Sequence, residues 1–308
     1  MRIFHSCVVN LFLMVLLMAL LGGCGNSGGE TTPAPLQTGD TPFPNNELLV
    51  SPAGEISPQA IILDARTENE YSAGHIPGAI SAPTIMFETQ EGVLLDDAAL
   101  EDQLGKLGIA LTSKIIIYDR ATDTNSAAGR LFWILKYMGC TDVSILNGGW
   151  DKWLAYDHVG TTAATVPPLA TVFTKSSGSM VKVANKEEVA GYFNNGTKEG
   201  YILIDVRTKE EYEVGHIPGA INFPYNNCFN PDKTVLNFKD LQSLLTAAGV
   251  TTDKEIVVYS NKNHRGGFLY FLCQLMGYPN VTIYLGSIED WTEANPTAYP
   301  LISGSTSY

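Results

Sequence analysis

The sequence predicts an α/β protein made of two tandem domains, each a mainly parallel sheet flanked by helices. The first observation is an internal repeat, because residues 63–80 recur almost unchanged as residues 204–221, an offset of 141. The second is an alternation of short strand-like runs with longer helix-like runs. The third is that the strand-like runs are continuously apolar, which is typical of parallel strands buried on both faces.

The N-terminal segment 1–23 has the features of a signal peptide. It carries one charge, Arg2, and its apolar run is shorter than the roughly 20 residues that span a bilayer. Its end, Leu21-Gly-Gly-Cys24, resembles the bacterial lipobox, in which cleavage precedes a cysteine whose thiol is acylated. The resemblance implies an exported protein, anchored in the cell envelope by lipid on Cys24, at the outer membrane or periplasmic face in a Gram-negative cell. An ordinary signal peptide with an incidental cysteine is the alternative.

Composition limits the partners of the mature chain. Residues 24–46 are rich in Gly, Ser, Pro and Thr and predict a flexible tether. The formal net charge of −13 becomes −14 when Arg2 is removed with the signal peptide, which disfavours binding to nucleic acid or to anionic lipid surfaces. Membrane attachment is therefore left to the lipid. Cys140, Cys228 and Cys273 have no CxxC spacing, so neither a disulfide framework nor a metal site is indicated, and no cofactor is predicted.

The first domain is predicted over residues 47–158. Its apolar run at 61–63 is followed by Thr67-x-x-Glu70, a capping box that opens a helix. Three more elements complete the strand–helix alternation: a strand at 115–118, a helix at 127–138 and a strand at 143–146.

A Thr-, Ala-, Pro- and Ser-rich linker, residues 159–179, leads to the second domain at 180–304. The offset of 141 holds as far as Tyr118 and Tyr259, and then falls to 138, so the loop that follows is three residues longer in the first domain.

In the second domain, the loop that follows Tyr259 is the candidate site. A β-branched strand at 256–259 and an apolar helix at 268–276 enclose the polar stretch from Ser260 to Arg265, which therefore lies at the carboxyl edge of a strand. Backbone N–H groups and the helix dipole there favour an anion, with residue 260 in the floor of the site. The donors and up to three positive charges would come from Asn261, Lys262, Asn263, His264 and Arg265. A solvated loop without a ligand is the alternative.

The loop resembles the active-site loop of the rhodanese family, Cys-x-x-Gly-x-Arg between a strand and a helix, and the two GHIPGA sextets at 74–79 and 215–220 resemble family hallmarks. The resemblance covers about residues 47–156 and 180–300 and implies two rhodanese-like domains related to thiosulfate or 3-mercaptopyruvate sulfurtransferases. Two residues depart from the pattern, because Ser260 replaces the sulfur-carrying cysteine and Asn263 replaces the glycine. The first-domain equivalent of Ser260 is Asp119, as in tandem members whose N-terminal domain is catalytically silent.

A serine hydroxyl is far less acidic than a thiol and cannot form a persulfide, so Ser260 is expected to be inert as a sulfur carrier. The leading hypothesis is a degenerate sulfurtransferase homologue that binds a small oxyanion or a protein partner. The alternative is an active sulfurtransferase that uses another cysteine, such as Cys228, facing Ser260 and Arg265. Phosphatases that share this fold need the cysteine and a loop one residue longer, which makes that function a weaker candidate.

His75 and His216 could act as bases, and the Asp-x-Arg and capping-box residues could form acid/base pairs. Their duplication in both domains instead favours structural roles, as hydrogen-bonded turn histidines, ion pairs and caps.

Overall fold

The computed structural model describes residues 41–120, 126–179, 181–194 and 199–306. The predicted signal peptide, Cys24 and most of the predicted tether lie outside these ranges. Among the described residues, no helix combines the length and apolarity needed to cross a bilayer.

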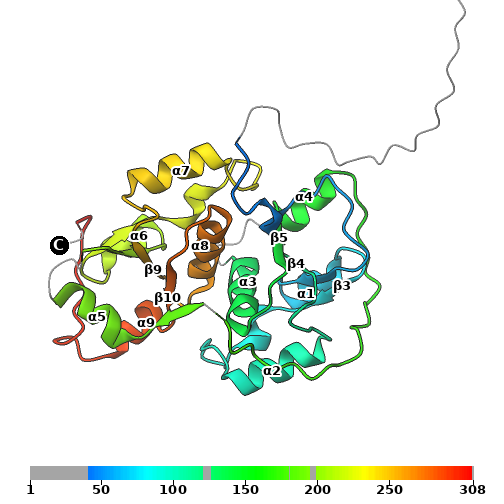
Figure 1. Cartoon of the computed structure of the whole chain (residues 1–308), viewed down its shortest axis with the longest axis horizontal. Helices are drawn as coiled ribbons and strands as arrows, with labels where there is room; N and C mark the ends of the chain where they lie inside the picture. The colour runs from blue at the N-terminus through cyan, green and yellow to red at the C-terminus, as the bar shows by residue number, and fades with distance from the viewer. Residues whose placement is uncertain (1–40, 121–125, 180, 195–198, 307–308) are drawn as a thin grey trace, which may run out of the picture. The chain divides into compact units, whose positions relative to one another are not determined.

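Each predicted domain contains one five-stranded sheet, and the described strands pair in parallel throughout. The strand order is β1-β5-β4-β2-β3 in domain 1 and β6-β10-β9-β7-β8 in domain 2, so the repeat in sequence is also a repeat in topology. The predicted fold class, two tandem α/β domains with parallel sheets flanked by helices, is confirmed (Figure 1).

The elements follow the alternation that the sequence indicates. In domain 1 they are η1 (Asn46–Leu48), β1 (Leu49–Val50), β2 (Ile61–Asp64), α1 (Glu68–Ala73), β3 (Ala79–Ser81), η2 (Thr84–Phe87), α2 (Asp97–Lys106), β4 (Ile115–Tyr118), α3 (Ala127–Met138), β5 (Val143–Leu146) and α4 (Gly149–Ala155). In domain 2 they are β6 (Lys182–Ala184), α5 (Lys186–Asn194), β7 (Tyr201–Asp205), α6 (Lys209–Val214), β8 (Ala220–Asn222), η3 (Tyr225–Cys228), α7 (Phe238–Ala247), β9 (Glu255–Tyr259), α8 (His264–Leu275), β10 (Val281–Tyr284) and α9 (Ser287–Glu293).

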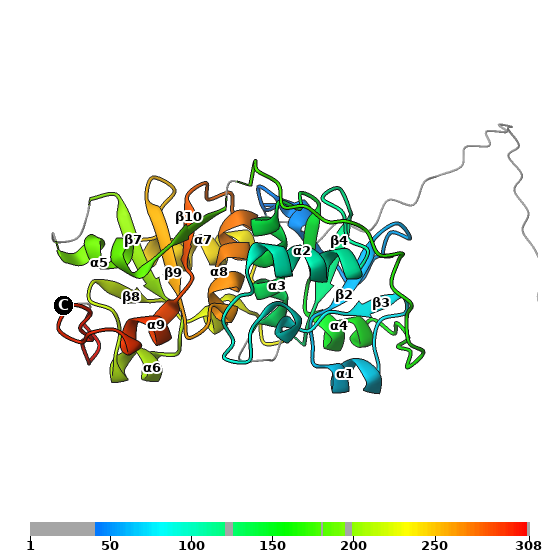
Figure 2. The same cartoon turned by 90° about the horizontal axis from the view of Figure 1, so that it is seen from below.

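Both faces of each sheet are covered, which explains the continuous apolar strands. In domain 1, Ile62 and Ile116 pack with Trp153 of α4 on one face, while Ile115 and Ile117 belong to the core that includes α2 and α3. In domain 2, α6 and α9 cover one face and α7 and α8 the other (Figure 2).

Helices α3 and α8 cross at two glycines that are equivalent in the repeat. A Cβ atom on Gly129 would lie 2.5 Å from Phe268 Cα, and one on Gly267 would lie 2.7 Å from Gly129 O. Only glycine allows such an approach, so the two helices pack backbone to backbone. Because residues 260–263 lead from β9 into α8, the crossing brings this loop to the boundary between the domains, and Asp119 and Ser126, which flank the equivalent segment of domain 1, lie at the same boundary.

Helix α8 begins earlier than the sequence predicts. It starts at His264, although the apolar pattern indicated a start near Phe268. Its first turn therefore includes His264 and Arg265, which the sequence pattern places in the loop.

Candidate functional site

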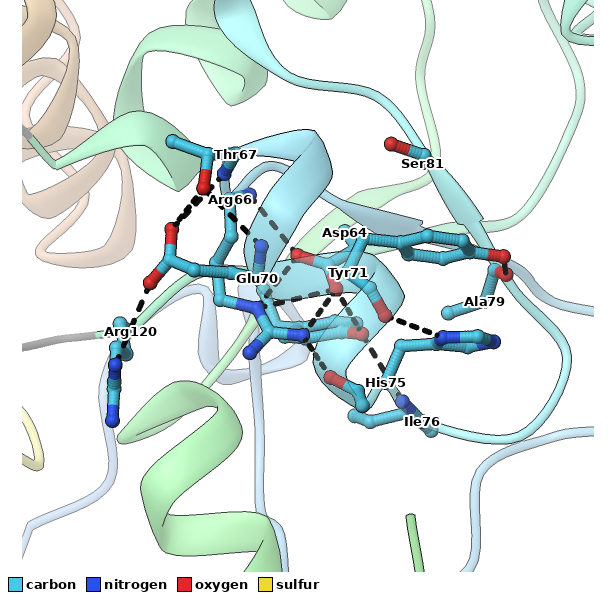
Figure 3. Close-up of polar contacts among 12 residues, drawn as sticks. Asp64, Arg66, Thr67, Glu70, Tyr71, His75, Ile76, Ala79, Ser81 and Arg120 are labelled. Carbon is cyan, nitrogen blue, oxygen red and sulfur yellow. Dashed lines mark hydrogen bonds and ion pairs between the residues drawn. The ribbon is translucent and has the colours of Figure 1, made fainter. Parts of the chain in front are cut away.

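The motif shared by both domains forms a buried polar network (Figure 3). Arg66 donates from Nη2 to Asp64 Oδ2 at 2.6 Å and to Gly74 O at 2.7 Å, and the Tyr118 hydroxyl also donates to Asp64 Oδ2 at 2.6 Å. The ring of His75 is fully buried, stacked on Tyr71, and bonded through both nitrogens to backbone carbonyl oxygens. The predicted structural role of the turn histidine is confirmed.

Domain 2 repeats these contacts and uses them to hold the candidate loop. Arg207 donates to Asp205 and to Gly215 O, and His216 is buried with both ring nitrogens bonded to carbonyl oxygens. The Tyr259 hydroxyl accepts from the backbone N–H of Ile217 at 3.1 Å. This network fixes the end of β9, the strand that leads into Ser260.

Ser260 lies at the end of β9 and is only 1% exposed. Its backbone N–H donates to Ser287 Oγ at 3.3 Å, and its carbonyl oxygen accepts from Ile288 N at 3.0 Å. Within the described residues, Ser260 Oγ has no hydrogen-bond partner, so no side chain there is placed to act on it as a general base.

Asn263 stabilises the backbone conformation of the loop. Its φ of 62° lies in the left-handed region, which glycine adopts freely and asparagine tolerates better than most residues. Its amide nitrogen donates to Tyr284 O at 2.6 Å and to Leu285 O at 2.7 Å, which ties the loop to the end of β10. Asn263 was one of the residues expected to supply donors to an anion, but its side-chain N–H groups donate to carbonyl groups of the protein.

Arg265 is paired within domain 2. Its guanidinium makes two hydrogen bonds to Glu211, Nη1 to Oε2 at 2.6 Å and Nη2 to Oε1 at 2.9 Å. The hydrogen bonds from Arg265 lower the pKa of Glu211 from its usual value of 4.5 to about 2, against the opposing effect of burial. The sequence identified Glu211 as a helix-capping residue, which is confirmed, but it gave no sign of this second role.

Lys262 and His264 reach domain 1. The ammonium group of Lys262 donates to the backbone oxygen of Glu91 at 2.6 Å and lies 3.5 Å from the Glu289 carboxylate. His264 Nε2 lies 3.0 and 3.2 Å from the two carboxylate oxygens of Glu88.

Glu88 also accepts from Nε of Arg130, a residue of α3, at 3.1 Å. Burial would raise the pKa of Glu88, but the hydrogen bond to His264 and the charge of Arg130 hold it below its usual value. The three basic residues of the loop, Lys262, His264 and Arg265, are thus each placed against a carboxylate of the protein.

Asp119 occupies the equivalent position in domain 1, at the end of β4. It is 7% exposed, and its Oδ2 accepts from Ala128 N at 2.9 Å in the first turn of α3. A cavity of about 20 Å³ lies beside Asp119, enough for a single water molecule. Domain 2 contributes Tyr225, Phe229 and Phe268 to its lining.

The described cysteines are all free and buried. Burial raises the pKa of Cys140 and of Cys273 to about 12, and raises that of Cys228 as well. Cys228 is 0% exposed and belongs to the same core as Cys273. The alternative hypothesis required Cys228 to face the loop, and its burial corrects that expectation.

The fold and the loop together define a tandem α/β protein in which a strand–loop–helix unit at each sheet edge forms the candidate site. The model of the rhodanese-like domain matches residues 49–156 and 186–294, and the chain belongs to this family.

Two relatives agree with this membership, and a solved structure has a similar fold. The chain is 29% identical to a thiosulfate sulfurtransferase of Azotobacter vinelandii over 269 residues, 81% of this chain and 95% of the relative. It is 30% identical to the sulfur carrier protein TtuD of Thermus thermophilus over 254 residues, 76% of this chain and 87% of the relative. The fold is similar to that of an anaerobic ergothioneine biosynthesis enzyme from Chlorobium limicola, with a TM-score of 0.75 and 22% identity, covering 85% of this chain and 71% of that one. The tandem domains and these homologues support a sulfurtransferase-like function.

Proposed function

We propose that this chain is an exported, lipid-anchored sulfurtransferase homologue whose domain-2 loop binds a small oxyanion or a protein partner without carrying sulfur itself. The observation that carries the proposal is the chemistry available at the loop. Ser260 stands at the end of β9 where the family's cysteine is expected, and its hydroxyl has no base among the described residues. A hydroxyl there can hydrogen-bond to a ligand but cannot take up a sulfane sulfur as a persulfide.

The buried cysteines support the same proposal. Sulfur transfer needs a reactive thiolate at the loop, whereas Cys140, Cys228 and Cys273 belong to the hydrophobic core and have raised pKa values. The names of two relatives indicate what such a loop recognises. One is a thiosulfate sulfurtransferase, whose name indicates thiosulfate as a substrate, and the other is a sulfur carrier protein. We infer that the loop keeps the recognition of a sulfur oxyanion or of a partner in sulfur transfer, after loss of the nucleophile.

A thiosulfate:cyanide assay on the purified protein tests this proposal. The expected result is no turnover above the buffer rate, and no gain of a sulfur atom in the intact mass after thiosulfate treatment, because the cysteines in the described part of the chain are buried and have raised pKa values. The matched variants Cys228→Ser and Cys273→Ser both remove a buried thiol. Wild-type activity that disappears in Cys228→Ser and survives in Cys273→Ser would establish the alternative, an active sulfurtransferase that uses Cys228.

The proposed anchor has its own test. Changing Cys24 to alanine removes the acylation site, so the exported protein is expected to move from detergent-dependent membrane fractions to soluble fractions, or to remain uncleaved. Labelled palmitate should enter the wild type and not the variant. A wild type that takes up no palmitate, with a variant that still fractionates with membranes, would contradict lipid anchoring.

A further inference from the structure

Asp119 and the loop that contains Ser260 lie beside different kinds of side chain, although the domains are repeats. The segment after η2 in domain 1 and the segment after η3 in domain 2 are equivalent, since the bridge between Glu88 and Leu94 recurs as that between Phe229 and Val235 at the same offset of 141. Each segment lies against the loop of the other domain. Phe229 lines the cavity at Asp119, whereas Glu88 contacts His264.

Glu88 and Phe229 occupy equivalent positions, and each contacts an equivalent residue in the first turns of α3 or α8. Arg130 follows Gly129 in α3 as Phe268 follows Gly267 in α8, and these two glycines mark the helix crossing. In domain 2 the pair is aromatic, with the rings of Phe229 and Phe268 stacked at 4.8 Å. In domain 1 the corresponding pair is ionic, with Arg130 and Glu88 joined at 3.1 Å. The loop that contains Ser260 therefore faces a carboxylate, whereas Asp119 shares its cavity with an aromatic ring.

This ion pair is buried and incompletely satisfied. The side chains of Arg130 and Glu88 are 1% and 7% exposed. Arg130 Nη1 is buried and has no hydrogen-bond partner among the described residues. A carboxylate in such surroundings is weakly screened by solvent and acts strongly on any charge that enters beside His264.

The same segment closes over the loop at a second point. The backbone oxygen of Glu91 accepts from Lys262, and the Lys262 side chain passes so close to Gly92 that a Cβ atom there would lie 2.8 Å from its Cδ. Contacts at Lys262 and at His264 thus place residues 88–92 against the domain-2 loop.

We propose that Glu88, contributed by domain 1, is a specificity-determining residue of the domain-2 loop. Its carboxylate supplies the negative charge that His264 would otherwise take from a ligand. The loop therefore discriminates against doubly charged oxyanions such as thiosulfate and sulfate, and selects ligands that present a positively charged or hydrogen-bond-donating group beside Glu88. This inference rests on the proposed function, and it favours a partner with such a group over a free sulfur oxyanion.

The test measures the affinity of the purified protein for thiosulfate and for sulfate by calorimetry. Glu88→Gln keeps the shape of the side chain and an oxygen that can accept from Arg130, but it removes the charge. The variant is expected to bind thiosulfate at least about tenfold more tightly than the wild type, because a unit charge a few ångströms away acts strongly on a dianion. Glu213→Gln is the matched control, since it makes the same charge change on α6 at a residue whose carboxylate pairs with Lys209 on the surface, and its affinity is expected to equal that of the wild type.

A second variant covers the case in which Glu88→Gln does not fold. Glu88→Phe/Arg130→Phe copies the pair found in domain 2, leaves no buried charge unpaired, and frees His264, so it should also bind thiosulfate more tightly than the wild type. Equal affinities in the wild type and the folded Glu88 variants, or an equal gain in Glu213→Gln, would overturn the proposal. Turnover of thiosulfate by the wild type would refute the proposed function alone, because the comparison of variants measures affinity.

Discussion

Replacing Ser260 with cysteine is expected to give the protein thiosulfate:cyanide sulfurtransferase activity, at least about a hundredfold above the wild-type background. The thiol would lie at the end of β9, just before the N-terminus of α8, where the helix dipole and nearby cations favour a thiolate. The loop backbone is compatible with this function, because Asn263 already has the positive φ that a glycine provides in the family pattern. Intact mass after thiosulfate treatment should show one added sulfur atom.

Two further variants make this result interpretable. Ser260→Ala removes the hydroxyl without adding a thiol and should stay inactive, which separates the gain from any general effect of substitution. Adding Asn263→Gly to Ser260→Cys restores the family pattern at both positions. If this double variant folds but transfers no sulfur, the loop has lost more than its nucleophile, and the proposal that it retains a ligand-binding geometry is wrong.

The repeated parts of the molecule could be predicted from the sequence because they depend on local patterns. Continuous apolar runs gave the strands, and Thr67-x-x-Glu70 gave a capping box that the structure contains. The duplication of His75 and His216 argued for a structural role, which their buried hydrogen bonds confirm. Each of these features is decided within a few residues of chain or by comparison of one repeat with the other.

The electrostatics of the loop could not be predicted in this way. Its basic residues suggested up to three positive charges for an anion, but Arg265 pairs with Glu211 and His264 with Glu88, 54 and 176 residues away in the chain. These partners depend on how α6 packs within domain 2 and on the crossing of α3 and α8. The sequence left open whether Cys228 faces the loop or is partly buried, because a short polar segment conceals its place in the core.

The ion pair between Asp64 and Arg66 gives the largest expected change in stability. Asp64 is fully buried, and Arg66 bonds to both of its oxygens (Figure 3). Arg66→Met would leave that carboxylate with only the Tyr118 hydroxyl and a backbone N–H as donors. Removing one partner of a buried pair leaves an uncompensated charge, so the free energy of unfolding of domain 1 should fall by about 3–5 kcal/mol. Urea unfolding followed by circular dichroism measures the loss.

A control variant at an exposed arginine separates the effect of burial from the effect of losing an arginine. Arg120 pairs with Glu70 and Asp151 at 3.6 and 3.4 Å, but its side chain is 46% exposed. Arg120→Met should therefore cost less than about 1 kcal/mol. Asp64→Asn combined with Arg66→Met removes both charges and should recover part of the loss, because no ion is then left without a partner. An Arg66→Met variant no less stable than Arg120→Met would show that solvent or a neighbouring group compensates the Asp64 charge, and the structural role assigned to the Asp-x-Arg motif would then be wrong.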